Sequence, residues 1–157
     1  MTTQNQLAAI QVNEIMSTHV QKLMADDTVQ EAVALMVDHS LNTIPIVDGE
    51  DRCIGILSRT DLTELFLQED QELSRVLETD RLSMEWIHRA LETSDVAQVK
   101  ELMTYEVAKI QEKQNLYEAA REMVRGKIHH LPVIDENEKL VGILSTFDIV
   151  KAVAQAD

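Results

Sequence analysis

The chain has 157 residues, 45% of them apolar, which is enough for one compact domain or for two small halves that share a core. Its formal net charge of −14 at pH 7 repels phosphates and excludes duplex nucleic acid as an expected partner. A single cysteine, Cys53, excludes an internal disulfide framework, and the lack of a signal peptide or a membrane-spanning apolar run predicts a soluble cytoplasmic protein without a membrane partner.

The first third of the chain predicts a small mixed unit. Residues 1–11 are expected to be a flexible or loosely helical N-terminus. A short strand is predicted around residues 20–23. Thr28 and Glu31 have the spacing of a capping box and open a helix. Two strands follow, separated by the acidic turn DGED, and a second helix starts at Ser58.

A helical insert is predicted over residues 67–98, because the helix that starts at Ser58 keeps its apolar spacing to about Glu78 and SMEWIHRALE predicts another helix. This second stretch carries Trp86, the only tryptophan of the chain. Trp86 is expected either to pack on its own domain or to anchor a partner or a second protomer.

The last third predicts the same unit again. A short strand is expected at residues 107–110, and Asn115 and Glu118 form a second capping box. We expect Gly126 to end that helix with a positive φ. A strand behind Pro132, the acidic turn DENE, a further strand and a helix from Ser145 complete the unit.

Both units align without a gap at an offset of 87 positions, the separation of Pro45 and Pro132. The alignment also matches Gly-Ile-Leu-Ser at both strand ends and pairs Asp61 with Asp148. We therefore expect two β-α-β-β-α repeats, over residues 12–66 and 99–157, with the insert between them.

Each repeat has an apolar-Met-Ser/Thr lead, an apolar-Pro-apolar-apolar-Asp strand and Gly-apolar-apolar-Ser-x-x-Asp, and this pattern resembles the cystathionine β-synthase (CBS) domain. The resemblance implies an α/β (α+β) tandem pair whose repeats pack pseudo-symmetrically, with two clefts between them. It further implies a regulatory module for energy sensing that binds AMP, ADP, ATP or S-adenosylmethionine, has no required cofactor, and forms a homodimer.

The strand end and helix start at Ser145 carry the ligand prediction for the second repeat. A helix N-terminus favours an anion, and the carboxylate of Asp148 is suited to accept hydrogen bonds from ribose hydroxyls. The same Ser-x-x-Asp spacing also fits a helix cap with no ligand. In relatives that sense nucleotides, the positions of His129 and His130 reach phosphates; alternatively this pair is structural.

The first repeat differs in charge, because Asn42 and Thr43 occupy the histidine positions while Arg59 either supplies a positive charge or is solvated. The resemblance implies ligand contacts from thirteen positions of this chain. They are Asn42, Thr43, Pro45, Ser58, Arg59, Thr60, Asp61, His129, His130, Pro132, Ser145, Phe147 and Asp148.

Catalysis is not expected, since the chain contains no phosphate-binding loop, nucleophile elbow or zinc-protease motif. His129 and His130 have no third partner that would make a metal site. Two functions remain open: a nucleotide sensor that controls dimerisation or an unidentified protein target, and an interaction scaffold with vestigial clefts.

Overall fold

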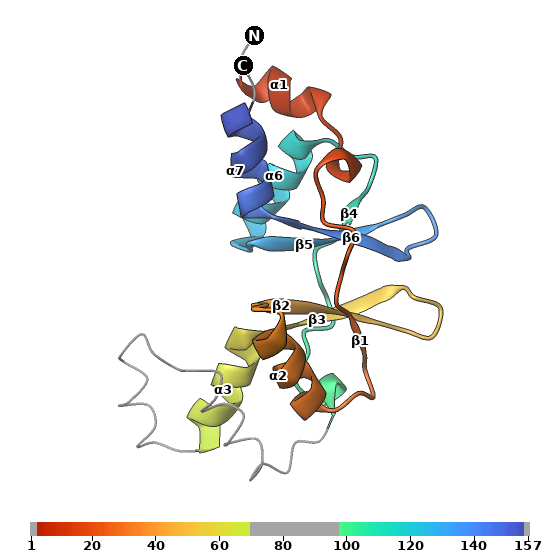
Figure 1. The fold of residues 1–157 in the computed structure, drawn as a ribbon, viewed down its shortest axis with the longest axis vertical. Coiled ribbons are helices and arrows are strands. Elements are labelled where there is room, and N and C mark those ends of the chain that lie inside the picture. Colours follow the sequence, from red (N-terminus) through yellow and green to blue (C-terminus); the bar gives the residue numbers. More distant parts are fainter. Residues whose placement is uncertain (1–2, 70–97, 156–157) are drawn as a thin grey trace. The chain divides into compact units, whose positions relative to one another are not determined.

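In the computed structural model, each repeat has the element order strand, helix, strand, strand, helix (Figure 1). The structure describes residues 3–69 and 98–155. Contacts divide the chain into two units, residues 1–20, 49–53 and 107–157 on the one hand and residues 21–48 and 54–106 on the other. The predicted mixed α/β fold with two β-α-β-β-α repeats is confirmed.

The unit with the second repeat has a three-stranded sheet whose helices lie on one face (Figure 1). Its elements are β4 (Ile110–Gln111), α6 (Leu116–Gly126), β5 (His130–Ile134), β6 (Leu140–Ser145) and α7 (Thr146–Gln155). β4 runs parallel to β5, and β6 runs antiparallel to it, with His130 opposite Ser145. The core between sheet and helices is apolar and includes Leu116, Ala119, Met123, Leu131, Val133 and Leu144.

The other unit repeats this arrangement with β1 (Leu23–Met24), α2 (Val29–Asp38), β2 (Thr43–Val47), β3 (Cys53–Ser58) and α3 (Arg59–Glu69). The leading strands β1 and β4 are shorter than predicted, because only two residues of each pair with the central strand. Cys53, the first residue of β3, is buried.

Helix ends follow local hydrogen bonds. Both predicted capping boxes are present: the Glu31 amide donates to Thr28 Oγ1 (3.1 Å) and the Glu118 amide donates to Asn115 Oδ1 (3.0 Å). The helix ends at Gly126, as predicted, but the predicted positive φ is wrong for Gly126, since the left-handed residue is Lys127, with φ of 50°. Because the next amide closes the helix by donating from Ile128 to Met123 O (3.0 Å), the turn falls one residue later.

The segment that leads into each repeat packs into the core of the other one. The Val12 amide donates to Gln114 O (2.9 Å), and the Val12 side chain is fully buried in the core of α6, β5 and β6. The Val99 amide donates to Asp27 O (2.9 Å), and Val99 belongs to the core of α2 and β2. Each compact unit thus combines segments from both sequence repeats. The repeat boundaries at residues 12–66 and 99–157 describe the sequence, and they stay a prediction.

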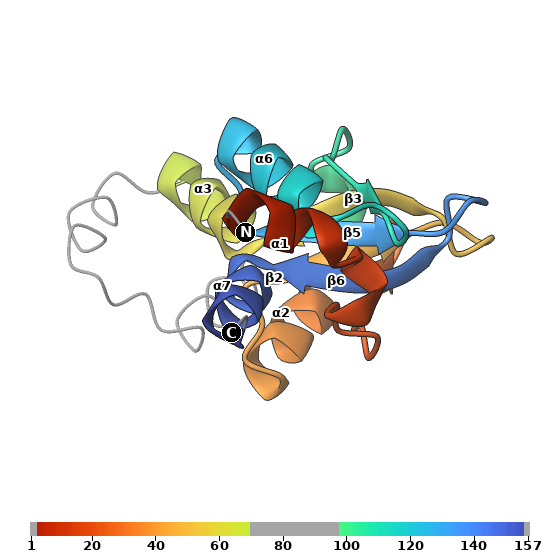
Figure 2. The same ribbon diagram turned by 90° about the horizontal axis from the view of Figure 1, so that it is seen from above.

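The N-terminal residues form helix α1 (Thr3–Ala9), which lies alongside α6 in both views (Figure 1, Figure 2). Leu7 and Ile10 pack against the second core, which explains why a segment predicted to be flexible or loosely helical has a place in the fold. The predicted insert beyond Glu69 and the helix with Trp86 lie outside the described residues. No helix in the described part of the chain is long and apolar enough to cross a membrane.

The glycines of the β3 and β6 strands make room for these leading segments. A Cβ on Gly142 would overlap the Met16 sulfur and lie 3.0 Å from the Ser17 carbonyl oxygen. At Gly55 the Thr104 carbonyl oxygen would lie 2.8 Å away. Ser17 pairs with Ile143, so the lead is attached to the sheet at the point where the side chain is missing.

We expect Gly142→Ala to lower the free energy of unfolding by about 1–3 kcal/mol, because backbone and sulfur must both move to admit the methyl group. The matched control is Gly49→Ala, where a Cβ meets nothing within 4 Å. Urea denaturation of both variants measures the difference. Equal midpoints for the two variants would contradict this close packing.

Candidate functional site

The junction between β6 and α7 is closed by reciprocal hydrogen bonds between Ser145 and Asp148. The Ser145 amide and its hydroxyl both donate to Asp148 Oδ2, at 2.8 and 2.7 Å, and the Asp148 amide donates back to Ser145 Oγ at 3.2 Å. Both side chains are half-buried. One carboxylate oxygen therefore caps the helix, which is the alternative that the sequence left open.

The β3–α3 junction has the same geometry. Asp61 Oδ2 accepts from the Ser58 amide (2.6 Å) and from Ser58 Oγ (2.7 Å), and the Asp61 amide donates to Ser58 Oγ (3.2 Å). No described residue donates to Oδ1 of Asp61 or of Asp148. The second oxygen of each carboxylate is thus an acceptor that a pair of ribose hydroxyls can use.

The backbone amides at these helix starts are mostly occupied. Beyond the cap bonds, the Thr146 amide donates to His129 O (2.9 Å) and the Arg59 amide donates to Asn42 O (3.0 Å). With a carboxylate already held at the N-terminus, little of the favourable field remains for an anion. The amides at these helix starts are therefore not free to hold the phosphate that we predicted beside Ser145, and such a phosphate would depend on side chains near the junction.

The two histidines lie at the start of β5. His130 is the first residue of the strand, is half-buried, and stands opposite Ser145, while His129 precedes the strand and is exposed. Burial lowers the pKa of His130, the adjacent His129 lowers it further, and Asp148 opposes both effects. A neutral imidazole thus lies beside the Ser145–Asp148 pair at neutral pH.

The first repeat places a permanent cation in the corresponding region. Arg59, the first residue of α3, donates from Nη1 to Asn42 Oδ1 at 3.1 Å, and Thr43 opens β2 next to them. The fold thus brings together Asn42, Arg59, Ser58 and Asp61, whose backbone or side-chain atoms are linked by these hydrogen bonds.

Four further predicted positions lie at the edges of the two junctions. Pro45 and Pro132 are buried in the central strands, whereas Thr60 and Phe147 are exposed in the first turns of α3 and α7. Because their side chains are exposed, Thr60 and Phe147 are accessible to a ligand, whereas the two buried prolines pack in the interior. Their contact with a ligand stays a prediction.

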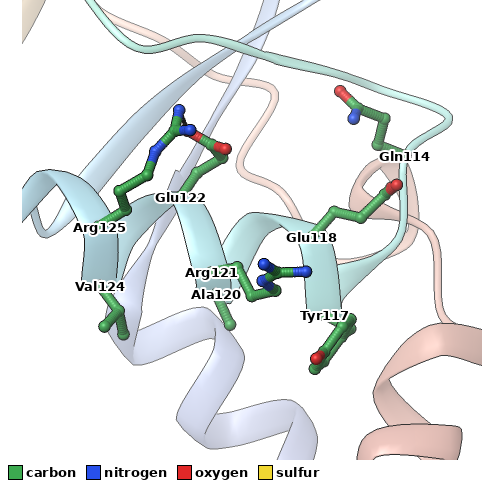
Figure 3. A pocket seen from close by; sticks show the side chains of 8 residues that line it. All are labelled: Gln114, Tyr117, Glu118, Ala120, Arg121, Glu122, Val124 and Arg125. Carbon is green, nitrogen blue, oxygen red and sulfur yellow. Dashed lines mark hydrogen bonds and ion pairs between the residues drawn. The ribbon is translucent and has the colours of Figure 1, made fainter.

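Sequence reasoning missed the outer face of α6. A depression there is lined by Gln114, Tyr117, Glu118, Ala120, Arg121, Glu122, Val124 and Arg125 (Figure 3). Val124 continues the apolar helical spacing of the buried Leu116 and Met123, but its side chain is 79% exposed. Helical spacing defines an apolar arc and does not say which edge of that arc stays uncovered. The guanidinium of Arg121 lies over the Tyr117 ring, 5.8 Å from its centroid.

Within the described ranges, no group of three or more His, Cys, Asp or Glu side chains is arranged to hold a metal ion. A family model described as CBS domain matches residues 12–68 and again residues 99–155. The chain belongs to the CBS domain family. It carries two such domains in tandem, as the repeat and its motifs predicted.

The curated relatives include a CBS domain-containing protein and a longer enzyme. CBSX1, a chloroplastic CBS domain-containing protein of Arabidopsis thaliana, is 28% identical over 82% of this chain and 56% of its own length. Inosine-5′-monophosphate dehydrogenase of Methanocaldococcus jannaschii is 27% identical over 92% of this chain and 24% of its own length. The chain thus spans about a quarter to about half of these relatives.

Solved CBS pairs have the same fold. CBSX2 in complex with AMP matches with a TM-score of 0.72 and 26% identity, over 93% of this chain and 97% of that one. A CBS domain pair in complex with 5′-methylthioadenosine and S-adenosyl-L-methionine matches with a TM-score of 0.68, over 94% of this chain and 98% of that one. At 22% identity, the second similarity shows the fold alone.

The lowered pKa of His130 links stability to pH. Between that pKa and the ordinary value of 6.5 the unfolded chain binds more protons, so stability should fall as the pH drops below 6.5 and level off above it. We expect His130→Gln to reduce this fall, as measured by urea denaturation from pH 5 to 8. His19→Gln, which removes an exposed imidazole, is the matched control. Superimposable curves for both variants would contradict the burial effect.

Proposed function

We propose that this CBS pair is a regulatory module without catalytic activity that binds an adenine nucleotide or another adenosyl compound at the strand–helix junctions. The observation that carries the proposal is that Oδ1 of Asp148, near the half-buried His130, accepts no hydrogen bond from a described residue. Oδ1 of Asp61 in the first domain is likewise unused, although no histidine lies at the corresponding position there. A carboxylate acceptor next to an imidazole suits a ribose that carries a further polar group.

The similar proteins support an adenosyl ligand. CBSX2, 26% identical and covered almost completely, was crystallised with AMP. The other CBS pair holds 5′-methylthioadenosine and S-adenosyl-L-methionine, which have in common with AMP the adenosine moiety and not the phosphate. Recognition of the ribose by Asp148 or Asp61 would serve all of these compounds, including ADP and ATP.

Comparison with the enzymes supports a regulatory role over a catalytic one. The dehydrogenase matches this chain over only 24% of the dehydrogenase's length, and a homoserine O-acetyltransferase of Methanosalsum zhilinae matches over 24% of its own length. The family match of this chain consists of its two CBS domains alone. Its location in the cytoplasm and a cleft shared between the repeats stay predictions.

One observation favours the alternative, an interaction scaffold without a ligand. Ser145 and Asp148 already hydrogen-bond to each other, so the Ser-x-x-Asp spacing that occurs in both domains has a structural role even where no ligand binds. The two functions differ in the fate of Asp148 Oδ1, which a ligand needs and a cap does not.

AMP at 100 times its dissociation constant should stabilise the protein by roughly 2.7 kcal/mol. Asp148→Asn should keep the cap, because the amide oxygen can replace Oδ2, but it replaces the Oδ1 acceptor by a donor. We expect AMP to bind this variant about 10–100-fold more weakly, the effect of losing a charged hydrogen-bond acceptor. Titration calorimetry and thermal unfolding measure affinity and stability separately.

Asp61→Asn is the matched control, since it makes the same change in the first domain. A loss confined to Asp148→Asn assigns AMP to the second junction, and a loss confined to Asp61→Asn assigns it to the first. Unchanged affinity in both variants, or no AMP binding by the unaltered protein, would favour the scaffold.

We further propose that the module is a homodimer that pairs through the outer face of α6 and α7. The proposed α6–α7 face comprises the exposed apolar side chains of the two helices, namely Val124 (79% exposed) on α6 and Phe147 (71%), Val150 (61%) and Val153 (41%) on α7. The helix α6 carries two acidic and two basic side chains, so this helix is locally neutral in a chain with a net charge of −14.

Phe147 gives this pairing a route to the ligand. It is part of the α6–α7 face, and it precedes Asp148 in the first turn of α7. A ligand that contacts the turn and a second protomer that covers Phe147 would act on the same residues. This adjacency supports a coupling of ligand binding to dimerisation.

Val124→Glu should convert the dimer to a monomer, because it places a charge at the centre of an apolar contact. Sedimentation velocity at micromolar concentration measures the change. Asn137→Glu adds the same charge on an exposed turn and should leave the dimer intact. A monomer for the unaltered protein, or a dimer that survives Val124→Glu, would contradict this face.

A further inference from the structure

The two CBS domains carry their basic side chains on opposite sides of the same backbone hydrogen bond. In the first domain the Arg59 amide donates to Asn42 O (3.0 Å), and in the second the Thr146 amide donates to His129 O (2.9 Å). The basic side chain therefore lies on the helix in the first domain and on the strand side in the second.

Side chains confirm that these two positions are neighbours. Arg59 Nη1 lies 3.1 Å from Asn42 Oδ1, so a group at either position reaches the same space beside the junction. At the equivalent positions the second domain has Thr146 and His129, with His130 next along the chain in place of Thr43. A guanidinium is thus exchanged for imidazoles at one place in the fold.

A guanidinium is charged at every physiological pH, whereas an imidazole is not. The groups around His130 decide how readily it takes up a proton. Asp148 on α7 favours the proton and His129 disfavours it, while β6 presents the uncharged Ser145 opposite. The face of α6 on the sheet is apolar, with Leu116, Ala119 and Met123. An anion bound beside His130 would favour the protonated form of its imidazole.

We propose that the first domain holds the anionic part of a ligand with the permanent charge of Arg59, and that the second does so with His129 and His130 only after one of them takes up a proton. Anion binding at the second junction then strengthens as the pH falls, and binding at the first does not. This inference rests on the proposed ligand function. It gives one module two junctions that respond differently to acidification.

The size of the effect follows from proton linkage. If binding raises the pKa of one imidazole, the affinity increases by up to about tenfold for each pH unit between its pKa in the free and in the bound protein. An uncharged nucleoside has no such partner and should bind with the same affinity throughout. AMP and adenosine, which differ by the phosphate, are therefore the two probes.

Two variants separate the junctions. Arg59→Gln leaves the imidazoles as the cationic groups, and the double variant His129→Gln, His130→Gln leaves Arg59. Calorimetric titrations with AMP and adenosine from pH 8 to 5.5 should show AMP binding to Arg59→Gln several-fold more tightly at pH 6 than at pH 7.5, relative to the double variant. Protonation of the AMP phosphate itself is common to both variants and cancels in this ratio.

A second measurement uses the unaltered protein. The ring-proton NMR signals of the five histidines, assigned by single substitutions, give each titration midpoint with and without AMP. We expect AMP to raise the midpoint of His129 or His130 and adenosine to leave it unchanged.

Equal pH dependence of AMP binding in the two variants, or unmoved histidine midpoints with AMP bound, would overturn this inference and leave the proposed function in place. Failure of AMP and adenosine to bind the unaltered protein at any pH would overturn both.

Discussion

The hydrogen bonds between Ser145 and Asp148, and their copies between Ser58 and Asp61, are the constraint on which the rest of the structure depends. They hold the point where a sheet strand turns directly into a helix, with no intervening loop. One carboxylate oxygen is used for this turn, and the other is kept in a fixed position by it. A structural cap thereby pre-organises an acceptor, which lowers the entropic cost of binding a sugar.

Local patterns in the sequence predicted most of the elements, because local hydrogen bonds set them. The capping boxes at Thr28 and Asn115 need only residues three apart, and the acidic turns need only the two strands beside them. The positive φ was assigned to Gly126 instead of Lys127 for a related reason. The amide of Ile128 fixes the turn through Met123 O, so the left-handed residue is set by hydrogen-bond register and not by where glycine stands.

Features that depend on distant residues were not predictable in the same way. The sequence repeat shows that Met16 and Met103 correspond, but it does not show that each lies against the glycine of the other repeat. The exposure of Val124 likewise depends on which neighbours α6 has, and helical spacing carries no information about that. For the candidate site, residue types predicted the carboxylate, hydroxyl and imidazole groups. Only the structure shows that Oδ2 of Asp148 accepts the cap hydrogen bonds while Oδ1 accepts none from a described residue.

Around the strand–helix junctions, the two domains differ at positions whose shared contact is made by the backbone. Ser145, Asp148 and Gly142 have identical counterparts, and each of these residues has a hydrogen bond or a close approach that another side chain would lose. Around the same junction, Asn42 corresponds to His129 and Arg59 to Thr146, and there the shared contact is made by backbone atoms alone. Side chains at such positions are free to change charge without changing the fold. The two domains share the hydrogen bonds of the junction and differ in the side chains beside it. They are therefore suited to present two chemically distinct junctions to related ligands.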